Sequence, residues 1–202
     1  MRKTKEEAEI TRQTLLRAAL VVFSRQGYAE TRLEDIAAEA GVTRGAIYHH
    51  FGGKAELYNT LVSEATGRVL PVIEAAIAEG GTTLAILRRL FVRTLLYAAQ
   101  DDDYRAVNEI ILFKTAVSEE LAEGMTRKIE GTRQTVAYFA QMIGQGIAAG
   151  EIRADLDPRD AALALIALQN GLLMLWLLDR DLFDLAGRAA ALADIYLRGI
   201  AA

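Results

Sequence analysis

The stretch TRLEDIAAEAGVTRGAIYHHF, residues 31–51, decides how the first quarter of the chain folds. Apolar residues recur at helical spacing over its first ten positions, which predicts a short helix with one buried face. Gly41 ends that helix. Thr43 then caps a second short helix, in which Ile47 points inward and Val42 packs against it as a hydrophobic staple. Two short helices joined by a glycine-containing turn are typical of a helix-turn-helix unit.

Helical patterns continue on both sides of this unit. Asp157-Pro158 is a strong helix start, a cap followed by proline at the first helical position, and Pro71 is expected to bend a long helix. No strand pattern competes, so we expect an all-α protein of about nine helices. Besides the two helices over 31–40 and 43–51, we expect seven more, over residues 4–27, 54–79, 83–100, 101–116, 118–150, 157–178 and 184–198.

Composition limits the possible classes of protein. The 202 residues are 52% hydrophobic, enough for a sizeable core, and contain no cysteine, which fits a reducing cytosol. The charged start has no apolar signal region after it, so we expect a cytoplasmic protein. The net charge is −4, yet residues 1–54 hold nine basic and seven acidic residues, a balance of +2. A polyanion would therefore meet the N-terminal quarter.

The chemistry of residues 43–54 suits the DNA major groove, where such a unit places its second helix. Thr43 and Tyr48 offer hydroxyls to phosphates, and Arg44 can fork onto guanine or pair with phosphate. His49 and His50 lie about 100° apart on a helix, so they are expected to donate to phosphates rather than share a metal. A surface helix joining two core helices is the alternative interpretation.

Residues 10–62 resemble the N-terminal domain of the TetR family of bacterial transcriptional repressors. The resemblance rests on AALVVFSRQGY, TRLEDIAAEAGVTRGAIYHHF and KAELY. The opening RKTKEEAEITRQ and the later VNEIILFK are similar to the AcrR-like multidrug-efflux regulators. His49 stands where that branch usually carries Trp, and Gly52-Gly53 replaces a more polar pair, which puts the exact operator contacts in doubt. The resemblance implies a helix-turn-helix DNA-binding domain over 1–54 and an effector-binding and dimerisation domain over 55–202.

Carried over residue by residue, the resemblance implies a set of DNA contacts in the N-terminal domain. Arg44 is the best candidate for reading a base, and Lys54 adds a point charge at the start of the next helix. The full set is Thr31, Arg32, Thr43, Arg44, Gly45, Tyr48, His49, His50 and Lys54.

AALALIALQNGLLMLWLL, residues 161–178, is an uncharged run at the lower length limit for a membrane-spanning helix. Polar residues in mid-run and close acidic flanks favour instead a helix buried on all sides of a soluble protein. One domain rarely buries a helix all round, so we expect a dimer contact and a ligand cavity to share it. The last two helices of TetR-type proteins form a dimer interface, which implies a homodimer through Ala167, Gly171, Ala189, Leu192, Ala193, Tyr196 and Ile200.

Polar residues that interrupt apolar helices favour a ligand pocket between helices. Asn108 and Glu109 interrupt one apolar stretch, and Gln169 and Asn170 interrupt another. Resemblance to efflux regulators places Asn108, Leu112, Asn170 and Met174 at effector-lining positions. The complete expected wall is Leu90, Phe91, Thr94, Asn108, Glu109, Leu112, Phe139, Ile166, Asn170, Leu173, Met174 and Trp176. Each of these residues has core packing as its alternative role.

These features predict a ligand-responsive repressor that binds a pseudo-palindromic operator as a dimer. A small, mostly apolar effector would release it, and an efflux pump would be the regulated system. A TetR-type regulator of lipid or other metabolic genes is one alternative, and a helical scaffold that binds another protein is a second. No nucleophile motif or phosphate-cradling loop is present, so we expect neither an enzyme nor a cofactor or metal.

Overall fold

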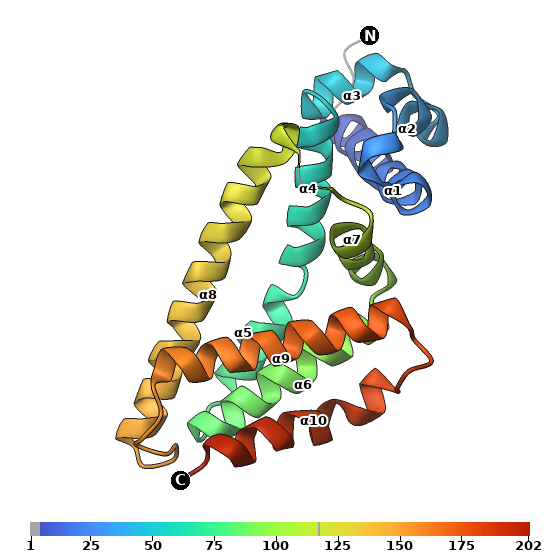
Figure 1. Cartoon of the computed structure of the whole chain (residues 1–202). Coiled ribbons are helices and arrows are strands. Elements are labelled where there is room, and N and C mark those ends of the chain that lie inside the picture. Colours follow the sequence, from blue (N-terminus) through green and yellow to red (C-terminus); the bar gives the residue numbers. More distant parts are fainter. Residues whose placement is uncertain (1–4, 117) are drawn as a thin grey trace. The chain divides into compact units, whose positions relative to one another are not determined.

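The computed structural model describes residues 5–116 and 118–202, and within them every regular element is a helix (Figure 1). Ile152 and Ala201 also form an isolated antiparallel β-bridge. The elements are α1 (Lys5–Glu30), α2 (Leu33–Ala40), α3 (Arg44–Phe51), α4 (Lys54–Gly67), α5 (Leu70–Ala78), α6 (Thr83–Gln100), α7 (Asp102–Phe113), the 3₁₀ turn η1 (Glu119–Leu121), α8 (Ala122–Ala148), α9 (Pro158–Leu178) and α10 (Leu185–Ile200). The all-α prediction is confirmed.

The chain divides into two compact units that are not contiguous in sequence. The first comprises residues 1–68 and 103–124, and therefore holds α1–α4, α7 and η1. The second comprises residues 69–102 and 125–202, with α5, α6, nearly all of α8, α9 and α10. The division into functional domains at residues 54 and 55 stays a prediction.

The first unit is built around the apolar face of α1. Leu15, Phe23 and Ile36 are fully buried in its core, and α7 contributes the buried Val107 and Ile110. Phe23, Tyr28 and Tyr58 form an aromatic cluster with ring centroids 5.0–5.8 Å apart. Such offset and edge-on contacts add about 0.5–1.5 kcal/mol per pair beyond burial.

Gly27 kinks α1 near its end, where the sequence predicts a stop. Its backbone has φ 78° and ψ 169°, a region open essentially to glycine alone. A Cβ at this position would lie 3.0 Å from the carbonyl oxygen of Lys114. The kink lets the N–H of Tyr28 donate to that same carbonyl, at 2.9 Å. Glycine is required here both by conformation and by the close approach of α7's C-terminal flank.

The helix expected over 54–79 is divided into α4 and α5, so the described residues form ten α-helices instead of about nine. Pro71 explains the division because proline has no N–H and its ring clashes with the carbonyl four residues earlier. That carbonyl belongs to Gly67, the last residue of α4. The chain leaves the first unit at the same place, between Arg68 and Val69.

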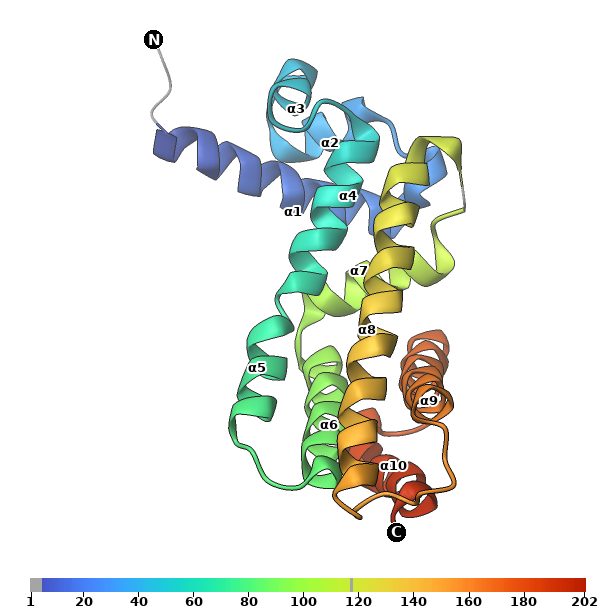
Figure 2. The same cartoon turned by 90° about the vertical axis from the view of Figure 1, so that its left-hand side faces the viewer.

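In the second unit, α6 packs chiefly against α10 and α5 (Figure 2). Leu87, Phe91 and Ile143 are fully or almost fully buried in its core. The start of α9 follows the sequence prediction, since the carboxylate of Asp157 accepts N–H bonds of 2.8 and 3.0 Å from the two residues after Pro158. The hydroxyl of Tyr196 on α10 donates to the carbonyl of Ala161 on α9 at 2.6 Å.

Candidate nucleic-acid interface

The turn between α2 and α3 fixes the angle of the candidate reading helix. Gly41 takes the left-handed conformation, with φ 65°, and its N–H donates to the carbonyl of Ala38 at 3.1 Å. The N–H of Val42 donates back to Ala37 at 3.0 Å, which completes a glycine-terminated helix end. Ile47 is 0% exposed and Phe51 is 4% exposed, so two apolar anchors hold α3 to the core of the first unit.

The opposite face of α3 is solvent-exposed. Thr43, Arg44, Gly45, Tyr48 and His49 are all exposed, whereas His50 is half-buried. Thr43 occupies the N-cap position as predicted, but its hydroxyl does not bond the helix end. Five of the nine predicted DNA-contacting residues therefore lie on the exposed face of α3 and its N-cap.

Arg44 is already engaged in the DNA-free protein. Its Nη1 donates to Oε1 of Glu34 at 2.5 Å, and its Nη2 donates to the hydroxyl of Tyr48 at 3.2 Å. The guanidinium carbon lies 5.3 Å from the centre of the Tyr48 ring. These bonds raise the pKa of Arg44 above its ordinary value, the Glu34 bond first. Glu34 was not among the residues that the sequence indicated, because an acidic side chain on α2 carries no signal for binding a polyanion.

Thr31 is a predicted DNA contact whose side chain is buried in the first unit. Its side chain is only 2% exposed, and its hydroxyl donates to the carbonyl of Gly27 at 2.6 Å. The hydroxyl therefore bonds the kinked end of α1, and a DNA contact by Thr31 stays a prediction. Arg32 takes the N-cap position of α2 instead and is exposed, and its N–H donates to Asp35 at 3.2 Å.

Lys54, a second predicted DNA contact, bonds within the first unit. Its ammonium donates to the carbonyls of Tyr28 and Thr31, both at 3.1 Å, and lies 4.5 Å from the centre of the Tyr28 ring. The residue is half-buried, and its charge is directed at the carbonyl-rich end of α1 rather than at solvent. Lys54 therefore joins the start of α4 to the end of α1.

Arg12 makes a second junction between the same two helices. Its guanidinium donates to Glu64 on α4, contacts Glu9 at 3.4 Å, and lies 5.7 Å from the centre of the Phe51 ring. The bond to Glu64 is the main reason that the pKa of Arg12 is raised. Lys54 at the start of α4 and Glu64 near its end therefore connect α4 to α1 at two points.

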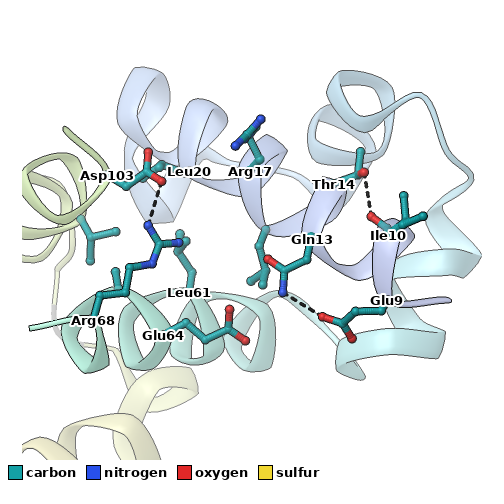
Figure 3. Close-up of a pocket in the computed structure, with 13 residues that line it drawn as sticks. Glu9, Ile10, Gln13, Thr14, Arg17, Leu20, Leu61, Glu64, Arg68 and Asp103 are labelled. Carbon is teal, nitrogen blue, oxygen red and sulfur yellow. Dashed lines mark hydrogen bonds and ion pairs between the residues drawn. The ribbon is translucent and has the colours of Figure 1, made fainter. Parts of the chain in front are cut away.

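A pocket of about 470 Å³ lies along this α1–α4 junction, and Figure 3 shows the residues that line it. Leu20 and Leu61 form part of its apolar wall, and Arg68 pairs with Asp103 at its rim at 2.9 Å. The predicted effector residues do not line this cavity.

The predicted effector wall is distributed over both units. Asn108, Glu109 and Leu112 belong to α7 in the first unit, and the other nine residues belong to the second. Asn108 donates to the carbonyl of Tyr104 at 2.8 Å, while Leu112 is 43% exposed.

Several of the nine predicted effector-wall residues in the second unit lie in its hydrophobic core. Leu90, Phe91 and Trp176 are at most 9% exposed and lie in its core. Three more are half-buried, namely Phe139, Ile166 and Leu173, and two are exposed, namely Asn170 and Met174. Thr94 is half-buried and accepts a hydrogen bond from Gln169, a polar pair set among apolar residues.

The predicted dimer stripe on α10 is largely buried within the second unit of this chain, and its role in a dimer stays a prediction. Ala189 and Ala193 are at most 1% exposed and Ile200 is 6% exposed, and all three pack in the core that α10 shares with α6. Leu192 and Tyr196 are half-buried. An apolar stripe on a helix predicts burial, and here the chain's own α6 covers it.

A different apolar face remains open on α9. Leu163, Ala167, Met174 and Leu178 lie on one side of this helix at spacings of four or seven residues, and all are exposed; Gly171 beside them is half-buried. Ile195 on α10 is 70% exposed. By length and composition α9 is apolar enough to span a membrane, but only 28% of its most apolar window is buried. The uncharged character of residues 161–178 was the available signal for this face.

Both the N-terminal and the C-terminal parts of the chain resemble known families. Residues 15–61 match the model of bacterial regulatory proteins of the tetR family. Residues 82–201 match that of the C-terminal region of MAATS-type transcriptional repressors. The HTH-type transcriptional regulator AcrR of Shigella flexneri is 35% identical over 97% of this chain and 94% of its own length.

Solved structures agree with the sequence comparison. NalD, the secondary repressor of the MexAB-OprM multidrug efflux pump in Pseudomonas aeruginosa, matches with a TM-score of 0.86 and 31% identity, covering 98% of each chain. A complex of SmeT with triclosan matches with a TM-score of 0.81 and 28% identity, covering 96% of this chain and 92% of that one. SmeT is the repressor of the Stenotrophomonas maltophilia multidrug efflux pump SmeDEF.

Proposed function

Because this chain belongs to the TetR family of bacterial transcriptional regulators, we propose that it is a dimeric cytoplasmic repressor released from its operator by a small apolar effector. The observation that carries the proposal is the exposed face of α3, held in place by the buried Ile47 and Phe51. Thr43, Arg44, Tyr48 and His49 provide hydroxyl, guanidinium and imidazole donors on that face. This is the donor chemistry that phosphates and base edges accept.

A second copy of the chain is supported by the open face of α9. An uncharged apolar stripe of this length is costly to leave in water, and a self-complementary C2 contact would cover it on both copies at once. Two copies would present two α3 helices to half-sites about 34–36 Å apart, or a multiple of that distance. A pseudo-palindromic operator follows from that symmetry.

Similarity to efflux-pump repressors supports an apolar effector and an efflux pump as the regulated system. AcrR, NalD and SmeT each match more than nine-tenths of this chain, and a SmeT structure contains triclosan. The half-buried Thr94–Gln169 pair in the second unit gives an amphipathic guest polar partners within apolar surroundings.

The proposed release mechanism is a population shift at the α4–α5 break. Since Lys54 and Arg12 join α4 to α1, the first unit would change orientation as one body, and the change would be absorbed where the chain crosses between the units, at residues 68/69, 102/103 and 124/125. An effector that prefers the altered spacing by about 1.4 kcal/mol lowers operator affinity about tenfold.

Fluorescence anisotropy with Arg44→Ala tests the DNA-reading part of the proposal. The operator probe is the duplex that the wild-type protein selects from a random library, and a scrambled duplex of equal length is the reference. Loss of a bidentate base contact costs about 1–3 kcal/mol, so operator affinity falls about five- to 150-fold. Arg25→Ala is the matched control, because Arg25 is an exposed arginine paired to Glu39 on α2 at 2.5 Å.

If Arg44→Ala and Arg25→Ala bind operator equally well, the assignment of α3 as the reading helix is wrong. Adding triclosan or related apolar phenols to the wild-type complex tests the effector part separately, by loss of anisotropy at fixed protein concentration. Resistance of the complex to a broad panel of such compounds contradicts the proposed effector class.

A further inference from the structure

Glu34 is an acidic residue that contacts Arg44 on the candidate reading surface of α3. It lies on α2, within electrostatic reach of Arg32, and accepts the 2.5 Å hydrogen bond from Arg44 on α3. Its side chain is 57% exposed and that of Arg44 is 55% exposed, so the pair lies in the surface rather than beneath it. A carboxylate at this position opposes binding of any polyanion, which calls for a physical explanation.

The geometry of the Arg44 guanidinium provides one. Of its five N–H donors, one is engaged by Glu34 and one by the Tyr48 hydroxyl. Three donors remain for DNA, on a group held from two sides and stacked on the Tyr48 ring. A phosphate needs only a positive charge within reach, whereas a guanine edge needs a fork of fixed orientation. The Glu34 contact weakens the attraction of Arg44 for phosphate and orients its guanidinium for a guanine edge.

We propose that Glu34 determines specificity by positioning Arg44: it neutralises the guanidinium towards phosphates of arbitrary sequence and orients its free donors towards one base. The inference rests on the proposed function, because it assumes that Arg44 reads DNA. Glu34 itself need not touch a base.

The strength of the pair suits this role. An exposed ion pair contributes little to stability, so a well-placed base edge can displace or share it without a large cost. The pKa of Glu34 is lowered, first by a backbone N–H bond and then by Arg44, so its carboxylate stays ionised near neutral pH. The pair is therefore present under the conditions in which the protein would meet DNA.

Glu34→Gln tests the inference, since glutamine keeps the shape and the acceptor oxygen but removes the charge. Affinity is measured for the selected operator and for the scrambled duplex over a series of salt concentrations. Scrambled-DNA affinity is expected to rise about two- to fivefold, and the salt dependence to steepen by about one phosphate contact. Operator affinity rises less, so the ratio of operator to scrambled affinity falls.

Glu39→Gln is the matched control. Glu39 lies on the same short helix and pairs with an exposed arginine at the same 2.5 Å, but that arginine is Arg25 on α1. Both variants remove one negative charge from α2, so they share any long-range electrostatic effect. Only Glu34→Gln is expected to lower the specificity ratio, and equal ratios in the two variants overturn the inference.

A double-mutant cycle with Arg44→Gln separates this inference from the proposed function. If Glu34 acts through Arg44, Glu34→Gln leaves the specificity ratio unchanged in the Arg44→Gln background. A ratio that falls equally in both backgrounds shows that Glu34 acts on its own, which also overturns the inference. If Arg44→Gln alone leaves operator binding intact, it is the proposed reading role of Arg44 that fails.

Discussion

The ammonium of Lys54 lies 3.1 Å from the carbonyl oxygen of Tyr28 and 4.5 Å from the centre of the same residue's ring. One side chain thus meets both the carbonyl end of α1 and the aromatic cluster of the first unit. The favourable helix-end charge and the cation–π contact act together at this point. Lys54, which the sequence predicts as a DNA contact, thus joins the end of α1 to the start of α4 in the folded chain.

Lys54→Met is therefore expected to lower the free energy of unfolding by about 2 kcal/mol, because the carbonyls lose a charged donor. Chemical denaturation followed by circular dichroism measures this loss. Lys128→Met, at an exposed position on α8, is the control and is expected to be nearly neutral. Wild-type stability combined with weakened operator binding would return Lys54 to the DNA contacts.

Gly27→Ala is expected to cost about 1–3 kcal/mol, since the new Cβ meets the Lys114 carbonyl in a backbone region that alanine avoids. Gly131→Ala is the matched comparison. Gly131 lies inside α8 with no neighbour within 4 Å of an added Cβ, so alanine there stabilises the helix by about 1 kcal/mol. Thermal denaturation of the two variants should move the midpoint in opposite directions, and a shift of the same sign contradicts the strain at Gly27.

Tyr196 links stability to alkaline pH. Burial raises its pKa from 10.0 to about 12. Because the folded protein holds this proton more tightly than the unfolded chain, its contribution is complete below the unfolded pKa and is lost as pH rises through the folded pKa. Between about pH 10 and about pH 12, wild type should lose more stability than Tyr196→Phe, in urea titrations at each pH. Parallel curves for the two proteins would show that Tyr196 titrates normally.

Ala167→Glu tests the proposed dimer. Ala167 lies in the middle of the exposed apolar face of α9, where two copies would bury the new carboxylates against each other. An unpaired buried charge costs about 3–5 kcal/mol, enough to weaken association at least about a hundredfold. Sedimentation velocity should show monomer for this variant and dimer for Gln141→Glu, an exposed position on α8. A dimer that survives Ala167→Glu moves the interface elsewhere.

Local patterns predicted much of this structure. The burial of Ile36 and Ile47 follows from helical spacing, the turn at Gly41 from glycine's access to the left-handed region, and the start of α9 from Asp157-Pro158. These features depend on residues close in sequence. The helix-turn-helix unit and the exposed face of α3 could therefore be predicted from the sequence alone.

The remaining features could not be predicted from the sequence because they depend on packing between residues far apart in the chain. Thr31 and Lys54 are polar and near the reading helix, but carbonyls at the end of α1 capture both. The α10 stripe containing Ala189 shows the same limit, because an apolar pattern does not specify whether α6 or a second copy covers it. The ion pair of Glu34 with Arg44 joins two helices across a turn, and its 2.5 Å contact depends on the angle between them.

The interleaving of the two units affects how this protein can be recombined with its relatives. The chain passes between units at residues 68/69, 102/103 and 124/125, since α7 returns to complete the core around Phe23. In a hybrid protein that takes residues up to the end of α3 from one parent and the rest from a relative, α1 of one parent would have to pack against α4 and α7 of the other. Transplanting residues 1–68 together with 103–124 keeps the donor's fastenings at Lys54 and Arg12 and carries its reading surface as an intact module.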